Sequence, residues 1–323
     1  MRKTIALALF CYSVIAMAQP NPDIPKDNKV VVITADIDNF WNAFDLLKNC
    51  NNAQDSINCI KSNYLGKGTE GLTVFINKYN YTAEDYVKAI SQYPKFFNSI
   101  RNNTLEVKNI ENSINLFYLK LKEYYPDYSL LKICFVISPL QSGGTTTGGY
   151  LFIGTEIIAS SKEADLSEFG ESVWAKVLAF DTNIRERLLF VVAHETIHDL
   201  QINADFNNYE LLNKSLNEGS ADYIAELLTG ARANHYLYDY GQRHEQELWN
   251  KFKKSLENNE SSDNWMYNYD RAEEGVPFDL GYYIGYKIAE KYYNNSADKK
   301  QALYDIIELK DPKAFLEKSG YGK

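Results

Sequence analysis

The chain has 323 residues, of which 45% are hydrophobic and 24% are charged. This length is enough to bury a large core, either as one domain or as two closely packed lobes. The formal net charge of -9, with no basic run along the chain, makes nucleic acid and anionic lipid poor partners, and we expect neither.

Residues 1–18 are typical of a secretory signal peptide. Arg2 and Lys3 precede an apolar run, and Ala16-Met17-Ala18 forms a small-residue cleavage site before Gln19. The run is too short to span a bilayer, and no later segment approaches the ~20 apolar residues that a spanning helix needs. We therefore expect an exported protein, periplasmic or extracellular, with no integral membrane segment after signal removal.

The cysteines suggest little chemistry of their own. Cys11 would be the acceptor of a lipid anchor, but Phe10 precedes it where a small residue is usual, so we do not expect anchoring as a lipoprotein. Cys50 and Cys59 could form a disulfide in an oxidising compartment or stay free as buried thiols. Cys134 lies in an apolar segment and is predicted to be a small core residue of a strand.

Strands alternate with helices early in the chain, whereas the later part is helical. A strand of β-branched residues is predicted at 29–35, and helices follow at 39–61, 71–79 and 83–125, the last interrupted near Pro94 and Asn102. Two further strands are predicted at 131–138 and 150–157, joined by the glycine-rich residues 141–149. That segment lacks the Lys of a phosphate-binding loop.

This order of elements predicts an α+β fold. A small mixed sheet with an edge strand should lie over the helix that contains residues 191–199, and a helical C-terminal lobe should follow. We expect one domain at 19–323, with an N-terminal lobe at about 19–203 and a C-terminal lobe at about 204–323.

The sequence Val191-Val192-Ala193-His194-Glu195-Thr196-Ile197-His198-Asp199 contains the pattern H-E-x-x-H. On a helix, residues four apart share one face, so His194 and His198 can bind one metal ion, and Glu195 reaches water at that ion. Asp181 or Thr182 is expected to cap the helix. The alternative is a pair of structural histidines on a buried helix.

A catalytic zinc site needs three protein ligands and one open position. Glu218 can be the third ligand, because residues 199–217 are long enough for a turn and a second helix that packs against the first. Asp222 lies one helical turn further and can accept the other ring N–H of a ligating histidine. Alternatively, Glu218 and Asp222 belong to an acidic, solvated helix face.

His194, Glu195, His198, Asn217, Glu218 and Asp222 match the H-E-x-x-H and N-E-x-x-x-D motifs residue by residue, and so the chain resembles the gluzincin metallopeptidases, the thermolysin-like clan. The resemblance implies a zincin-like fold and Zn²⁺ as the cofactor. The metzincin pattern is excluded by Gln201 and Ala204, where Gly and His would be required.

Four softer segments extend the resemblance over roughly residues 30–295. They look like a bacterial family of zinc-dependent proteases related to the gliding-motility lipoproteins of Bacteroidetes. The four segments are Ser142-Gly143-Gly144-Thr145, Ile153-Gly154-Thr155-Glu156, Asn217-Glu218-Gly219-Ser220-Ala221-Asp222 and Asp279-Leu280-Gly281-Tyr282-Tyr283-Ile284-Gly285-Tyr286.

Peptide hydrolysis also needs a group that stabilises the oxyanion, which in zincins is a tyrosine or a histidine. The candidates are Tyr282, Tyr286 and His244, in falling order, although most tyrosines of the chain must serve packing. His235 is expected in an exposed loop, and Trp249 is expected to be a core anchor.

The main functional hypothesis is a zinc-dependent peptidase that acts on peptide or protein substrates. Glu195 would act as general base toward a metal-activated water, and the strand end at 141–149 would pair with an extended substrate, unless this segment is a plain flexible hairpin. The alternative is a non-enzymatic envelope protein that uses a zincin fold as a binding part of a larger assembly. The sequence leaves the oligomeric state open.

Overall fold

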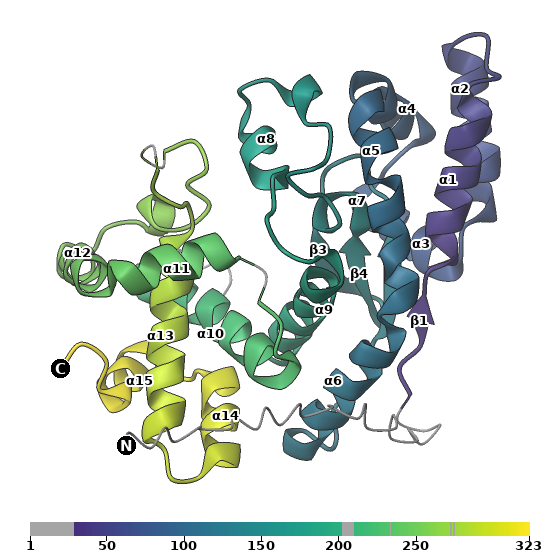
Figure 1. Ribbon diagram of the computed structural model, residues 1–323. Coiled ribbons are helices and arrows are strands. Elements are labelled where there is room, and N and C mark those ends of the chain that lie inside the picture. Colours follow the sequence, from purple (N-terminus) through teal and green to yellow (C-terminus); the bar gives the residue numbers. More distant parts are fainter. Residues whose placement is uncertain (1–28, 202–209, 233, 272, 274) are drawn as a thin grey trace, which may run out of the picture.

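The computed structural model describes residues 29–201, 210–232, 234–271, 273 and 275–323, and it is mostly helical with one small sheet (Figure 1). The expected signal peptide and Cys11 lie outside the described residues. The four strands are β1 (Val32–Ile33), β2 (Lys132–Val136), β3 (Gly144–Thr147) and β4 (Tyr150–Gly154), in the order β1-β2-β4-β3. β1, β2 and β4 are parallel, and β3 is antiparallel to β4. The predicted α+β class with a small mixed sheet is confirmed.

Two early predictions need correction. The strand expected at 29–35 is reduced to β1, because α1 (Ala35–Leu47) begins two residues after it. The helix expected at 39–61 is divided into α1 and α2 (Ala53–Asn63), because the side chain of Asn52 accepts the N–H of Asp55 and so begins a new helix.

The glycine-rich residues 141–149 form the edge of the sheet. Gly148 and Gly149 have φ values of 58° and 79°, which glycine adopts without steric cost, and they make the two-residue turn between β3 and β4. The N–H of Gly154 donates to the carbonyl of Gly143 at 2.9 Å. Because such pairs alternate in an antiparallel ladder, the backbone N–H and C=O groups of Gly144 and Thr146 point away from β4.

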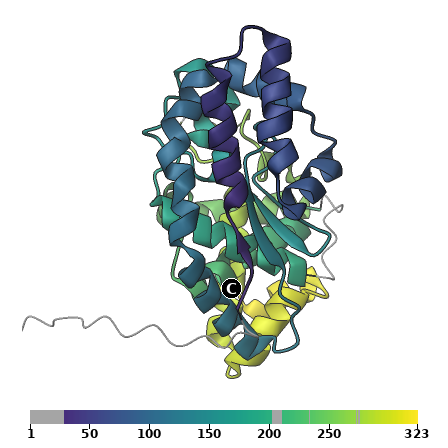
Figure 2. The same cartoon turned by 90° about the vertical axis from the view of Figure 1, so that its right-hand side faces the viewer.

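Helices surround the sheet on one side of the molecule and stack on each other on the other side (Figures 1 and 2). The first group comprises α1, α2, α3 (Glu70–Tyr79), α4 (Ala83–Gln92), α5 (Pro94–Thr104) and α6 (Glu111–Tyr124). The second group comprises α10 (Leu211–Thr229), α11 (His235–Arg243), α12 (Glu245–Glu257), α13 (Leu280–Asn295), α14 (Lys299–Glu308) and α15 (Pro312–Ser319). Between the groups lies α9 (Ile184–Leu200), which packs against β3, β4 and α10. Two short helices, α7 (Thr155–Ile158) and α8 (Val173–Leu178), precede it.

Glycines allow α10 and α13 to approach closely. A Cβ on Gly219 would overlap the backbone nitrogen of Tyr286, and a Cβ on Gly285 would overlap the carbonyl of Ser215. Gly219 and Gly285, one in each of the two motif segments at 217–222 and 279–286, are therefore explained by this helix crossing. The crossing fixes α10, which carries Glu218, against α13, which carries Tyr282.

The described cysteines are free thiols. Cys134 is buried in β2, as predicted, whereas Cys50 and Cys59 are only partly buried and are not joined by a disulfide. Burial, together with the neighbouring Cys50, raises the pKa of the Cys59 thiol. Within the described parts of the chain, no helix is both long enough and apolar enough to cross a membrane.

Candidate metal site

Helix α9 carries the H-E-x-x-H pattern. Its N-cap is Asn183, whose side chain accepts the N–H groups of Arg185 and Glu186, so the expected caps Asp181 and Thr182 were wrong by one or two residues. Arg187 is buried in the first turns and donates to the carbonyls of Ile158 and Ser160, which joins α9 to the segment after α7.

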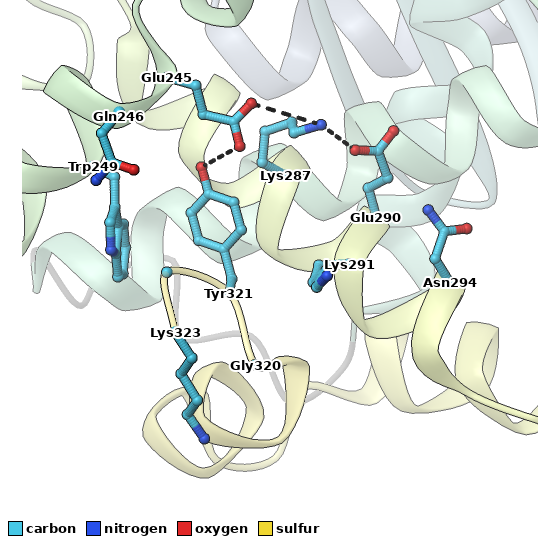
Figure 3. A pocket seen from close by; sticks show the side chains of 11 residues that line it. Glu245, Gln246, Trp249, Lys287, Glu290, Lys291, Asn294, Gly320, Tyr321 and Lys323 are labelled. Atoms are coloured by element: carbon cyan, nitrogen blue, oxygen red, sulfur yellow. Dashed lines mark hydrogen bonds and ion pairs between the residues drawn. The ribbon is translucent and has the colours of Figure 1, made fainter.

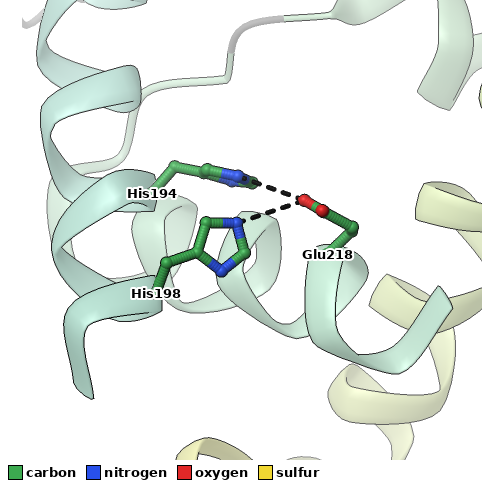
Figure 4. A group of neighbouring side chains, drawn as sticks. All are labelled: His194, His198 and Glu218. Carbon is green, nitrogen blue, oxygen red and sulfur yellow. Dashed lines mark hydrogen bonds and ion pairs between the residues drawn. The ribbon is translucent and has the colours of Figure 1, made fainter. Parts of the chain in front are cut away.

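His194 and His198 from α9 and Glu218 from α10 converge on one point (Figure 4). The Nε2 atoms of His194 and His198 lie 3.4 Å and 3.1 Å from Oε2 of Glu218. Among the described residues, these three form the group of ligand atoms, all within 4.8 Å of one another, that could hold a metal ion. The structure thus brings together the three ligands that the sequence predicted.

Side chains behind the imidazoles fix their orientation. Nδ1 of His194 lies 2.7 Å from Oδ1 of Asp222, as the sequence predicted, and Tyr238 donates its hydroxyl to Oδ2 of the same carboxylate at 2.5 Å. Nδ1 of His198 lies 2.7 Å from Oε1 of Gln201. The sequence reasoning had used Gln201 only to exclude another class of zinc site and had missed this role.

The partners of Gln201 determine the protonation of His198. The side-chain nitrogen of Gln201 donates to the carbonyl of Asn217 at 2.9 Å and to the hydroxyl of Ser220 at 3.0 Å. The atom of Gln201 that faces His198 is therefore its amide oxygen. A hydrogen bond to that oxygen requires a proton on Nδ1 of His198, which leaves Nε2 as a lone pair in the neutral imidazole. The acceptor Asp222 imposes the same tautomer on His194.

The cluster brings buried groups of opposite charge together. Burial lowers the pKa of both imidazoles, but Asp222 and Glu218 raise the pKa of His194 well above its usual range, and Glu218 raises the pKa of His198. Burial raises the pKa of Glu218, yet the two histidines hold it well below the usual range. Two imidazole nitrogens and one carboxylate oxygen are a typical donor set for zinc, and either bound protons or a metal ion can satisfy them.

Glu195 lies in the cleft that opens in front of this cluster. A Cβ on Gly144 would lie 2.5 Å from Oε1 of Glu195, so glycine in β3 is what allows the edge strand to approach the carboxylate. The cleft is also lined by apolar side chains from α7 to α11 and from the segment before α13, including Ile158, Val177, Phe180, Phe190, Leu237 and Phe278.

Only one of the three predicted oxyanion candidates lies in this cleft. Tyr282 lines it, with its ring 6.4 Å from the ring of His194. Tyr286 instead packs against Tyr238 behind the site. His244 lies between α11 and α12, stacked on Tyr240, and does not line the cleft. The sequence could not show this, because it does not indicate the direction in which α12 runs.

The tyrosine in contact with a predicted ligand is Tyr267, which the sequence reasoning missed. Its hydroxyl donates to Oε1 of Glu218 at 2.7 Å, and it precedes α13 in a loop for which no sequence pattern predicts a direction. Burial, with Glu218 beside it, raises the pKa of Tyr267 above its usual range, so the hydroxyl keeps its proton.

Two further residues singled out in the sequence lie outside the cleft. Trp249 is buried, as predicted, and His235 is exposed, as predicted, but it begins α11 instead of lying in a loop.

A second pocket lies at the other end of α13, beside the C-terminal residues (Figure 3). Its charges satisfy one another: Lys287 contacts the carboxylates of Glu245 and Glu290, and Tyr321 donates to Glu245 at 3.1 Å. These contacts pair the charges at its centre, whereas the cleft at His194 gathers two histidines and a glutamate on one point, so that cleft is the better candidate.

The fold and the cluster define a class of α+β protein in which two packed helices present two histidines and a glutamate to an open cleft. The family model described as gliding motility protein GldB matches residues 21–323, and the chain belongs to this family of gliding motility lipoproteins. No curated protein and no solved structure matches the chain. The resemblance to the gliding-motility lipoproteins is confirmed, whereas no comparison supports membership of the gluzincin peptidases.

Family membership also bears on localisation. We expected no lipid anchor because Phe10 precedes Cys11, but the family is one of lipoproteins, and this finding favours anchoring against that expectation.

Proposed function

We propose that this chain is an exported envelope protein that holds Zn²⁺ between α9 and α10 and binds a peptide segment of a partner at the cleft. The family match carries the envelope role. The single structural observation that supports the metal is the convergence of Nε2 of His194, Nε2 of His198 and Oε2 of Glu218, with Nδ1 of each histidine turned to a hydrogen-bond acceptor.

The edge strand supports peptide binding. The outward N–H and C=O groups of Gly144 can pair with an extended chain laid along β3. At the next outward position, Lys78 donates to the carbonyl of Thr146 at 3.1 Å and to the hydroxyl of Thr145 at 2.6 Å. A lysine on a strand edge limits further pairing. The bound segment would therefore pair beside Glu195 and leave the sheet at Lys78.

A second function, peptide hydrolysis, is favoured by Glu195. A binding module has no need of a carboxylate next to the ligand cluster, yet Glu195 lines the cleft beside both histidines. Zinc at this position would polarise a carbonyl and lower the pKa of water. Glu195 would then accept a proton from that water and return it to the leaving amine, while Asp222 and Gln201 keep the imidazoles oriented.

Zinc content and cleavage of a peptide library, measured on the exported protein and on Glu195→Gln, separate the two functions. Hydrolysis by the wild type that disappears in Glu195→Gln at unchanged zinc content would establish the peptidase. Stoichiometric zinc with peptide binding but no cleavage would establish the binding role. Absence of stoichiometric zinc from the wild type contradicts the metal site itself.

For localisation, we propose that Cys11 carries a lipid anchor. Metabolic labelling with a radioactive or clickable fatty acid should mark the wild type and leave Cys11→Ser unmarked. Equal labelling of both proteins would contradict the assignment.

A further inference from the structure

Tyr267 is held at the cluster by an unusual backbone. It has φ 53°, in the left-handed region that an aromatic residue adopts only with backbone strain. Its N–H donates to the carboxylate of Asp279, which is itself left-handed at φ 62° and donates its own N–H to Oδ1 of Asn268 at 2.8 Å. Asp279 thus holds the backbone of Tyr267 and is itself held by Asn268, which points to a constraint other than packing.

The constraint is the position of the Tyr267 hydroxyl beside Glu218. It lies 2.7 Å from Oε1 of Glu218, whereas Oε2 of the same carboxylate faces the two imidazole nitrogens. The hydroxyl of Tyr282 approaches that of Tyr267 at 3.4 Å from the other side. The side chain of Glu218 is only 9% exposed, so few water molecules can replace a lost partner at Oε1.

Resting on the zinc site proposed above, we propose that Tyr267 is a positioning residue that makes Glu218 a one-oxygen ligand. Its hydrogen bond occupies Oε1, so Glu218 would hold the metal through Oε2 alone and would leave the side toward the cleft open. Without this bond, the carboxylate could turn and place both oxygens on the metal, which would add a ligand and crowd the side that faces the cleft.

The test is cobalt substitution of the full chain, with Tyr267→Phe compared with the wild type and with Tyr236→Phe. Tyr236 tethers the same loop by donating to the carbonyl of Gly275 at 2.8 Å but does not line the cleft. Tyr267→Phe keeps the ring, so the fold should persist, and circular dichroism checks that it does.

We expect Tyr267→Phe to weaken metal binding on the order of 10-fold, as is usual for the loss of a hydrogen bond to a ligand. The visible cobalt bands should also lose intensity, because two-oxygen binding by Glu218 raises the coordination number. Tyr236→Phe should change neither quantity. Wild-type affinity and an unchanged cobalt spectrum in Tyr267→Phe would overturn this inference while leaving the metal site intact, whereas a wild type that binds no metal would overturn both.

Discussion

Glu218 and Glu156 are both buried carboxylates, and they differ in what surrounds them. Glu218 faces two imidazoles and its pKa lies well below the usual range. Glu156, in α7, is fully buried and accepts the N–H of Ser138 at 2.9 Å and its hydroxyl, so burial prevails and raises its pKa to about 7. Burial therefore does not by itself make a functional carboxylate. A site arises where buried groups of opposite charge converge on the same point.

The largest effect is expected from a change that tests whether the crossing of α10 and α13 keeps Glu218 facing the two imidazoles. In Gly219→Ala, the new methyl group must push α10 away from α13, and we expect a loss of about 3 kcal/mol in the free energy of unfolding together with a loss of zinc binding. Urea denaturation and metal titration measure the two effects. Lys291→Ala, at an exposed position of α13, should change the stability by less than about 0.5 kcal/mol. An alanine at 219 without effect would show that the crossing is loose.

The second prediction uses pH to distinguish the two glutamates. The pKa of Glu156 is higher in the folded chain than in the unfolded one, so its contribution to stability is complete below about pH 4.5 and disappears as pH rises to about 7. From the pKa difference, this loss amounts to about 3 kcal/mol. Denaturation curves across this range should show it, and Glu156→Gln should flatten the dependence. A variant with the same pH profile as the wild type would exclude Glu156 as its source.

A third prediction concerns the hydrogen bonds that orient the imidazoles facing Glu218. Gln201→Leu removes the hydrogen-bond acceptor of Nδ1 of His198, so the proton of the imidazole is no longer confined to Nδ1. Zinc affinity should therefore fall on the order of 10-fold. Isothermal titration with zinc measures this. Gln246→Leu, at an exposed position of α12, is the control and should bind zinc as the wild type does. If Gln201→Leu also bound zinc as tightly as the wild type, the orientation argument would be wrong.

The smallest effect is expected at the approach of β3 to Glu195. Gly144→Ala should displace the Glu195 carboxylate, weakening peptide binding several-fold while zinc binding stays unchanged. Thr147→Ala, on the same strand but not lining the cleft, is the control. Equal peptide affinity for Gly144→Ala and the wild type would place the bound segment elsewhere.

The parts of the site that follow from local geometry were predictable. The spacing of His194 and His198 determines that they share a helix face, and Gln201 could have been found the same way, because it follows His198 by three residues. Tyr267 contacts Glu218 across 49 residues of sequence, and no local rule relates a loop to a helix at that distance. The same limit explains why the sequence could not tell that Tyr286 and His244 lie outside the cleft.

Boundaries of elements were less predictable than their types. The break between α1 and α2 depends on one capping side chain, Asn52, whereas the spacing of apolar residues predicts one continuous helix there. The edge strand β3 consists of glycine and threonine, and its position depends on α9 and Lys78 as much as on its own residues.

The most direct test of the account is X-ray absorption at the zinc edge of the zinc-loaded chain. We expect one zinc per chain with two imidazole nitrogens at ~2.0–2.1 Å and oxygen ligands completing a four-coordinate shell. In Glu218→Ala, zinc should no longer bind stoichiometrically. A zinc ion without imidazole ligands, or unchanged zinc binding in Glu218→Ala, would contradict the proposal that α9 and α10 together form the metal site.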